Sequence, residues 1–170
     1  FAILLKGASY SPDILTKQIK PHIYAMPEPY NFSRQEINDF LGGNGHHYAD
    51  ELEDALTQMQ QAQNIGSALV INLSSSARDF ISDRLNELNE KQKRIELDLT
   101  EIGGLKRISP FLHPILMLTD SYPAVVANPP YMGSGNMNAD LKMYINNHYP
   151  ISKADLFAVF MEVLPSRTVK

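Results

Sequence analysis

The chain has 170 residues, of which 44% are hydrophobic and 20% are charged, and its net charge is −4. This length allows one domain or part of one, and the composition is ordinary for a globular protein. The absence of cysteine excludes disulfide scaffolds and thiolate metal sites and fits a cytoplasmic location. No apolar run approaches the roughly 18 residues of a membrane span, and an acidic chain is not expected to grip DNA by itself.

The N-terminal region predicts a helix followed by a short strand. Residues 1–10 are mostly apolar and read as the end of a buried helix. Residues 21–26 favour a strand, which Pro27 and Pro29 close. Glu28 lies at the end of this strand, where it is either a weak candidate for ligand binding or a solvated loop acid.

Two polar helices are predicted next. Ser33 and Glu36 have the spacing of a capping box, and the helix they start should stop at the glycine pair 42–43. A second helix, 48–63, carries an apolar stripe. The histidine pair 46–47 favours a solvated loop over a metal site, because adjacent side chains point to different faces and no carboxylate sits at ligand spacing.

The middle of the chain predicts a strand and then a long helix. Residues 66–73 read as the strand, and residues 77–102 read as the helix, which the glycine pair 103–104 should end. The apolar seam of this helix is narrow, as in coiled coils. Such a seam suits a helix hairpin or pairing with a second copy of the chain, and the alternative is an ordinary amphipathic helix. The seam consists of Ile81, Leu85, Leu88, Gln92, Ile95 and Leu99.

Residues 105–119 predict another apolar helix. Ser109 and Pro110 have the residue types of an N-cap and a first helical position, and Pro114 should kink the helix. His113 has apolar neighbours, which favours a packed histidine over a catalytic base.

The most informative stretch joins an apolar segment to a rigid turn. Residues 124–127 are small or β-branched and predict a buried strand. Pro129 and Pro130 have no N–H and a fixed φ, so the strand must end there, and Asn128 is pushed towards an extended conformation. The turn therefore presents an amide and the ring of Tyr131 at the end of a strand, where α/β sheets bind ligands.

This turn suits the methylation of an amine on a planar base. Such an amine is a poor nucleophile, because its lone pair is delocalised into the ring. The side-chain oxygen of Asn128 and the carbonyl of Pro129 can accept hydrogen bonds from its two N–H groups. These bonds would draw the amine towards tetrahedral geometry. Pro130 keeps the backbone from turning away, and Tyr131 offers a face on which an extruded base can stack. No charged base is needed if the proton leaves late to water.

The region after the turn is predicted to be a flexible loop and two helices. Gly133 gives the loop beside the base pocket its conformational freedom. Asn138 can cap a helix over 139–147, and Ser152 with Asp155 forms another capping box. Lys142 and Lys153 bracket the loop: they either meet DNA phosphate or are two surface lysines.

The motif at 128–131, with the segments 131–138, 149–157 and 160–162, resembles the N6-adenine-specific DNA methyltransferases, most of all the PglX type of BREX phage-defence systems. The resemblance implies an α/β fold, a partial Rossmann-like methyltransferase sheet, with helical insertions at 32–64 and 75–104 and a catalytic segment at 105–164. It also implies S-adenosyl-L-methionine as cofactor.

The same resemblance makes the chain a fragment of one catalytic domain. The main cofactor loop is expected upstream of Phe1, which leaves Glu28 as the weak candidate within the chain. Relatives commonly carry an acid at Pro123 or Ala124, and Asp120 is the nearest acid here. The fragment alone is expected to be inactive, and exposed sheet edges are expected to favour self-association.

The predicted function is therefore part of an adenine-specific DNA methyltransferase. DNA would be bound through other regions of the parent protein, with further partners in a phage-defence or restriction-modification system and no membrane. The predicted catalytic residues are Asn128, Pro129, Pro130 and Tyr131, and the predicted substrate-binding residues are Tyr131, Gly133, Lys142 and Lys153. The alternatives are methylation of an amide or of an RNA amine, or a non-catalytic interaction module.

Overall fold

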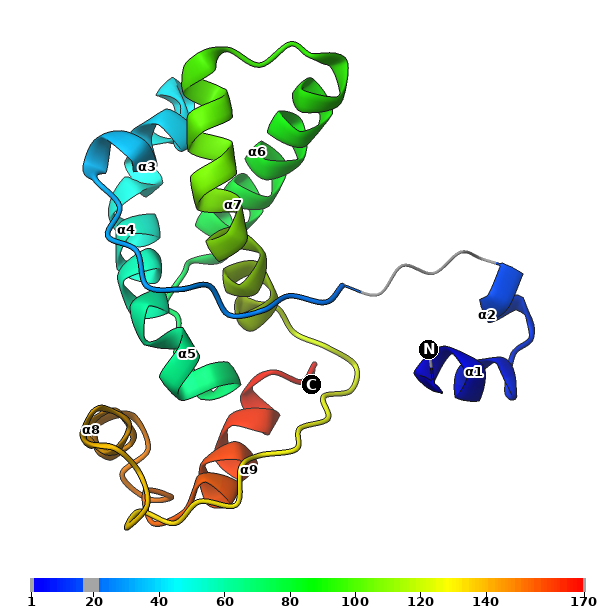
Figure 1. Cartoon of the computed structure of the whole chain (residues 1–170), viewed down its shortest axis with the longest axis vertical. Coiled ribbons are helices and arrows are strands. Elements are labelled where there is room, and N and C mark those ends of the chain that lie inside the picture. The colour runs from blue at the N-terminus through cyan, green and yellow to red at the C-terminus, as the bar shows by residue number, and fades with distance from the viewer. Residues whose placement is uncertain (1, 17–21, 170) are drawn as a thin grey trace.

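The computed structural model describes residues 2–16 and 22–169, and these residues form a helical structure (Figure 1). The helix α1 confirms the predicted N-terminal helix, although Phe1 lies outside the described residues and Leu5 is half exposed. None of the described helices is both long and apolar enough to cross a membrane. The helices are α1 (Ala2–Ala8), α2 (Asp13–Thr16), α3 (Arg34–Leu41), η1 (Gly43–Tyr48), α4 (Ala49–Gln58), η2 (Met59–Gln61), α5 (Ala62–Ile65), η3 (Gly66–Ala68), α6 (Ser75–Arg94), α7 (Leu99–Thr119), α8 (Ala139–His148) and α9 (Leu156–Ser166).

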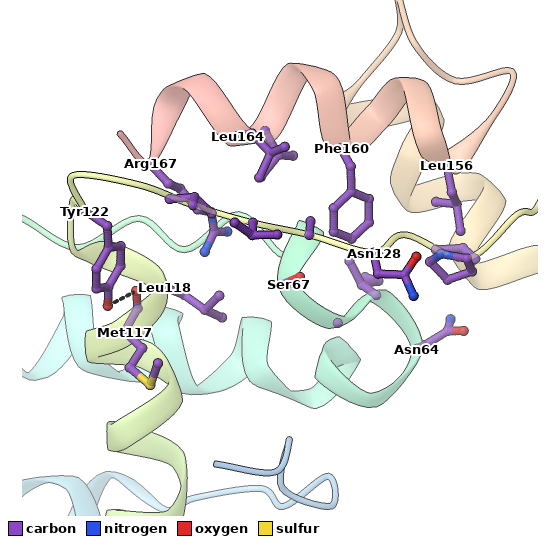
Figure 2. A pocket seen from close by; sticks show the side chains of 18 of the residues that line it. Asn64, Ser67, Met117, Leu118, Tyr122, Asn128, Leu156, Phe160, Leu164 and Arg167 are labelled. Atoms are coloured by element: carbon purple, nitrogen blue, oxygen red, sulfur yellow. Dashed lines mark hydrogen bonds between the residues drawn. The ribbon is translucent and has the colours of Figure 1, made fainter. Parts of the chain in front are cut away.

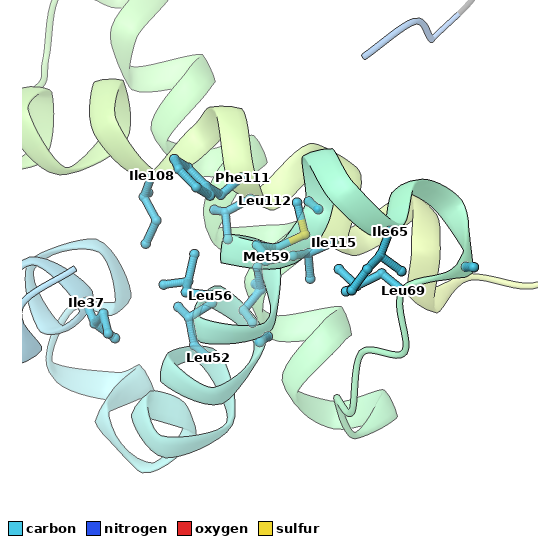
Figure 3. Close-up of a cluster of buried hydrophobic side chains, with 14 of the residues drawn as sticks. Ile37, Leu52, Leu56, Met59, Ile65, Leu69, Ile108, Phe111, Leu112 and Ile115 are labelled. Carbon is cyan, nitrogen blue, oxygen red and sulfur yellow. The ribbon is translucent and has the colours of Figure 1, made fainter. Parts of the chain in front are cut away.

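The hydrophobic core lies where α7 packs against α3 and α6, with α4 and α5 closing one side (Figures 1 and 3). Each helix contributes apolar residues spaced three or four apart, so one face is buried and the other is polar. Burying side chains of this size is the main favourable term in folding, about 1.5–3 kcal/mol for each. The fully buried large side chains include Ile37, Phe40, Leu52, Met59, Ile81, Leu88, Ile108, Leu112 and Ile115.

The prediction of a single helix over 77–102 is wrong, because this region forms a hairpin of two helices, α6 and α7. The helix α6 ends where Ile95 takes a left-handed conformation, with φ 62°. Asp98 then caps α7 in a reciprocal capping box with Glu101, so the glycine pair 103–104 lies inside α7 instead of ending a helix. Ile81, Leu85 and Leu88 of the predicted seam are buried where α6 packs against α7 (Figure 1), whereas Ile95 and Leu99, near the turn of the hairpin, are 93% and 88% exposed.

An ionic network fastens the hairpin to α3. Arg84 is 13% exposed and Glu101 is 15% exposed, and their side chains are 3.4 Å apart. Lys91 contacts Glu101 at 3.0 Å and Glu87 at 3.2 Å, and Nε of Arg84 donates to the carbonyl of Phe40 at 3.0 Å. Partly buried pairs are screened less than surface pairs, so this network helps to fix the angle of the hairpin.

The predicted sheet is absent from the part of the chain that the structure describes. Residues 22–26 of the predicted strand 21–26 are unpaired, and Pro21 lies outside the described residues. The predicted strand 66–73 is a 3-10 turn followed by an irregular segment, and 124–127 has no strand partner. Two isolated bridges, between Tyr122 and Thr168 and between Gly133 and Asp155, are the β-pairings of the described residues. The α/β, Rossmann-like prediction is therefore wrong for this chain, which is helical.

Side chains satisfy the backbone where a neighbouring strand was expected. Tyr149 donates to the carbonyl of Ala68 at 2.7 Å, and the hydroxyl of Tyr144 accepts from the N–H of Val70 at 2.7 Å. β-branched residues favour an extended conformation, but they do not supply a partner for a ladder. The segment after η3 is consequently extended without being a strand.

Several predicted helix ends are confirmed and others are wrong. The capping box of Ser33 with Glu36 and the cap at Asn138 are both present. The last helix is capped by Asp155 instead of Ser152, whose hydroxyl donates to Glu162 at 2.6 Å.

The predicted helix start at Ser109 and Pro110 is also wrong. The helix α7 begins at Leu99 and runs through Pro110 and Pro114. The capping box at Asp98 and the burial of the apolar face on α3 and α6 outweigh the hydrogen bonds that the two prolines remove.

The position of Gly103 gives a test of the observed start of α7. A methyl group at Gly103 would meet no atom within 4 Å, and the residue is exposed within a helix. Gly103→Ala should therefore raise the free energy of unfolding by about 0.5–1 kcal/mol, measured by urea denaturation. The matched change Gly66→Ala should lower it, because Gly66 has a φ of +62°. Destabilisation by Gly103→Ala would contradict a helix at this position.

Glu36 predicts how stability depends on pH. The N–H of Ser33 and the guanidinium of Arg107 hold the pKa of Glu36 at about 2, below the ordinary 4.5. Because the pKa is lower in the folded chain, this contribution to stability is present above about pH 4.5 and is lost as the pH falls towards 2.

Glu36→Gln keeps the residue type that a capping box needs and removes the charge. It should therefore reduce the loss of stability between neutral pH and about pH 3, measured by chemical denaturation at each pH. Glu96→Gln, at an exposed position, is the control. A loss of unfolding free energy at low pH that is as large in Glu36→Gln as in the unaltered chain would contradict the assigned contacts.

Candidate functional site

The stretch around Asn128 lines a cavity of about 570 Å³ (Figure 2). Its walls come from α5 and η3, from the end of α7 and from α9. Polar side chains in the lining include Asn64, Ser67, Asn128 and Arg167. Most of the remaining wall is apolar, and it includes Leu118, Val125, Leu156, Phe160, Val163 and Leu164.

Residues 123–131 are here called the Asn128 span. Its N-terminal end is fixed beside the C-terminal end of α9. The N–H of Tyr122 donates to the carbonyl of Arg167 at 2.9 Å, and Val169 donates to the carbonyl of Tyr122 at 3.1 Å. The hydroxyl of Tyr122 also donates to the carbonyl of Met117 at 3.0 Å. The start of the span is thereby tied to both α7 and α9.

The second end of the span is fixed beside the start of α9. Leu156 donates to the carbonyl of Met132 at 3.0 Å, and Ser134 donates to the carbonyl of Ala154 at 2.8 Å. The predicted loop residue Gly133 lies between these bonds and bridges Asp155. The span is therefore held at its two ends, and no hydrogen bond to other described residues is formed along it.

The structure brings Asn128 and Pro130 to the cavity and leaves Tyr131 outside it. Asn128 and Pro130 line the cavity, and the side chain of Asn128 is exposed without a hydrogen-bonding partner among the described residues. Pro129 is partly buried. Tyr131 is 92% exposed, so both faces of its ring are open for stacking. Val126 is 95% exposed, which leaves an apolar residue of the span uncovered by the described chain.

The two predicted substrate lysines lie on the surface. Lys142 is exposed on α8, and Lys153 is exposed in the turn before α9. Neither lines the Asn128 cavity. Both readings of these lysines, contact with DNA phosphate or simple surface charge, stay predictions.

The structure does not bring the candidate acids to this cavity. Glu28 lines a different cavity together with Tyr30 and Arg107. Asp120 pairs with Arg78 at 3.1 Å and does not line the Asn128 cavity. His113 is partly buried at the edge of the core and does not line the Asn128 cavity; its ring stacks on Tyr24 at 4.7 Å between centroids, and burial lowers its pKa.

The cavity does not fit S-adenosylmethionine. That cofactor carries a positive sulfonium, a positive ammonium group and a carboxylate. Arg167 could pair with the carboxylate, but the ammonium group and the ribose hydroxyls need acceptors such as an Asp or Glu side chain. The described residues that line the cavity include no carboxylate and one cation, Arg167. We therefore assign no residue of the described chain to the cofactor.

Sequence reasoning missed an amide pair that positions α8 against the cavity. The side-chain nitrogen of Asn138 donates to the side-chain oxygen of Asn64 at 2.8 Å, and the reverse contact is 3.3 Å. The oxygen of Asn138 also accepts from the N–H of Leu141 at 2.8 Å. The sequence identifies Asn138 as a helix cap, but it holds no signal for Asn64, because the pairing is long-range.

Sequence reasoning also missed Arg167. Its Nη2 donates to the carbonyl of Leu69 at 2.9 Å, and burial lowers the pKa of the guanidinium. Tyr149, which lies nearby, has its pKa raised to about 12 by burial, so it is neutral at physiological pH. Arg167 lies beyond the last predicted helix, where nothing in the sequence indicates burial.

Comparison of the sequence with known proteins places the chain in a family. The sequence matches the family described as Eco57I restriction-modification methylase over residues 16–165. An adenine-specific methyltransferase PglX from Lacticaseibacillus casei (strain Zhang) is 28% identical over 170 residues, covering 99% of this chain and 14% of that protein. An adenine-specific methyltransferase BrxX from Escherichia coli O9:H4 (strain HS) is 43% identical over 68 residues, covering 40% of this chain and 6% of that protein.

The chain thus spans only a small part of the curated relatives that it matches. The match nevertheless covers most of the chain and includes every residue that lines the Asn128 cavity except Arg167. The resemblance read from the motif is confirmed: the chain belongs to the Eco57I restriction-modification methylase family of adenine-specific methyltransferases.

Proposed function

We propose that this chain is the amine-orienting part of a DNA methyltransferase that transfers a methyl group from S-adenosylmethionine to N6 of adenine. The observation that carries the proposal is the unpartnered amide of Asn128 at a cavity, on a span held at its two ends. The names of the relatives support adenine as the substrate base.

The residues of the span act by polarising the amine. The side-chain oxygen of Asn128 and the carbonyl of Pro129 each accept a hydrogen bond from one N–H of the adenine amine. These two bonds favour a tetrahedral nitrogen, whose lone pair is free to attack. Because both acceptors are held in place before the reaction, they stabilise the developing charge without rearranging. S-adenosylmethionine, when bound, supplies the electrophilic methyl group.

Tyr131 is proposed to stack on the base as it leaves the duplex, before the base enters the Asn128 cavity. The amine of an adenine that is stacked inside a duplex cannot reach Asn128. The base must therefore leave the stack, which costs a few kcal/mol. Stacking on an aromatic ring is worth about 1–3 kcal/mol for a base, which offsets much of that cost. The open faces of Tyr131 suit this role.

The grip on DNA is proposed to come from other regions of the intact protein. The chain has a net charge of −4, and tight binding to duplex DNA depends on neutralising phosphates with Lys and Arg. Lys142 and Lys153 are proposed to add local phosphate contacts beside the flipped base. The relatives' family is one of restriction-modification enzymes, so a role in defence against foreign DNA is proposed as well.

The proposal is tested by Asn128→Ala in the intact protein that carries this sequence. Loss of one preorganised polar group should lower the rate of adenine methylation by about 10²–10³-fold. Binding of S-adenosylmethionine should stay nearly unchanged, measured by calorimetry. The matched control is Asn146→Ala, at an exposed position of α8. Methylation of adenine at the normal rate by Asn128→Ala would refute the role of this amide.

A further inference from the structure

A half-buried positive charge lies at the opposite end of the cavity from Asn128. Figure 2 shows Arg167 beside Tyr122, where the Asn128 span begins, and Asn128 near Leu156, where the span approaches its end. Both side chains line the same cavity. The cavity therefore has a cation at one end and an uncharged amide at the other.

The guanidinium of Arg167 has free donors. It carries five N–H groups, and one hydrogen bond, from Nη2 to the carbonyl of Leu69 at 2.9 Å, is formed with the described residues. Within 4.0 Å of it the described residues provide no carboxylate. A charge removed from water without a counter-charge is unfavourable, and burial already lowers its pKa. This end of the cavity is thus suited to an anion.

The space between the two ends suits a flat apolar body. Val125 and Leu118 line it from the span and from α7, while Phe160 and Leu164 line it from α9. A volume of about 570 Å³ is within the range of sites for small ligands and cofactors. A ligand that fits has an anionic group, a planar body and, at the far end, N–H donors for an amide oxygen.

We propose that this cavity binds an adenine nucleotide, with its phosphate on Arg167 and its exocyclic amine at Asn128. The amine end of this assignment rests on the proposed function, whereas the phosphate end rests on Arg167 alone. A phosphate bound by a guanidinium forms charge-assisted, bidentate hydrogen bonds, which fix orientation as well as add affinity. Arg167 would thus set the direction in which the base enters the cavity.

Calorimetric titration of two ligands into this chain tests the phosphate end. 2′-Deoxyadenosine 5′-monophosphate should bind about 10-fold or more tighter than 2′-deoxyadenosine, as expected for hydrogen bonds to a charged group. Arg167→Gln should remove this preference. Arg94→Gln, which deletes an exposed guanidinium at the end of α6, should keep it. Equal affinity of the unaltered chain for the two ligands, or a preference that survives in Arg167→Gln, overturns the inference.

A second measurement needs no variant and covers the case in which Arg167→Gln fails to fold. In the ¹⁵N spectrum of arginine side chains, the signals of Arg167 should shift on addition of the nucleotide and not on addition of the nucleoside. Unmoved Arg167 signals at a nucleotide concentration that saturates the chain would overturn the inference, as would failure of the nucleotide to bind.

A third ligand separates this inference from the proposed function. 2′-Deoxyinosine 5′-monophosphate keeps the phosphate and lacks the amine, so it should bind more weakly than the adenine nucleotide if Asn128 contacts the amine. Equal binding of these two nucleotides, both dependent on Arg167, would keep the phosphate site and count against the amine contact. Methylation that depends on Asn128, with no role for Arg167, would do the reverse.

Discussion

The position of the Asn-Pro-Pro-Tyr turn depends on the two sets of backbone bonds that hold the Asn128 span. Tyr122 is bonded to Arg167 and Val169, and Met132 is bonded to Leu156. Both sets use the ends of α9, so this one helix determines where the span starts and where it ends. Pro129 and Pro130 stiffen the span directly after Asn128, and the span forms no hydrogen bonds to other described residues along its length. The amide of Asn128 is therefore presented by anchoring at a distance and not by contacts of its own.

The segment around 68–70 in turn holds both α8 and the C-terminal end of α9. Three side chains from the C-terminal part of the chain reach its backbone: Tyr149 at Ala68, Arg167 at Leu69 and Tyr144 at Val70. Leu69 itself is fully buried in the core. This short segment thus connects the helical core built on α7 to the helices that carry the site. Buried polar contacts of this kind help to specify one arrangement, because breaking one leaves a backbone group unpaired.

Signals from neighbouring residues mark helix ends correctly at Ser33 and Asn138, but not at Ser109 or at the glycine pair 103–104, which lie inside α7. The caps at Ser33 and Asn138 are read from residues only three positions apart, and both are present. The strands at 66–73 and 124–127 were predicted from β-branched residues, whose extended preference is real but does not supply a partner. The sequence does not indicate the end of α6 at Ile95, because a left-handed conformation is rare for a β-branched residue.

The residues of the candidate site are likewise of two kinds, those in one contiguous motif and those brought together only by folding. Asn128 and its prolines form a contiguous motif, so sequence and chemistry alone indicate them. Asn64 and Arg167 enter the same cavity from distant parts of the chain, through a side-chain amide pair and a backbone carbonyl. No periodicity or spacing encodes such contacts. Only the folded arrangement shows that the cavity has an amide at one end and a cation at the other.

The proposed role of Asn128 is to accept a hydrogen bond from an adenine amine through its carboxamide oxygen. Its most direct test is the ¹³C and ¹⁵N spectrum of the Asn128 side chain during titration with 2′-deoxyadenosine and, separately, with N6,N6-dimethyl-2′-deoxyadenosine, which has no N–H to donate. The Asn128 carbonyl signal should move with the first ligand and stay in place with the second. The same movement with both ligands, or no movement with either at saturation, would contradict it.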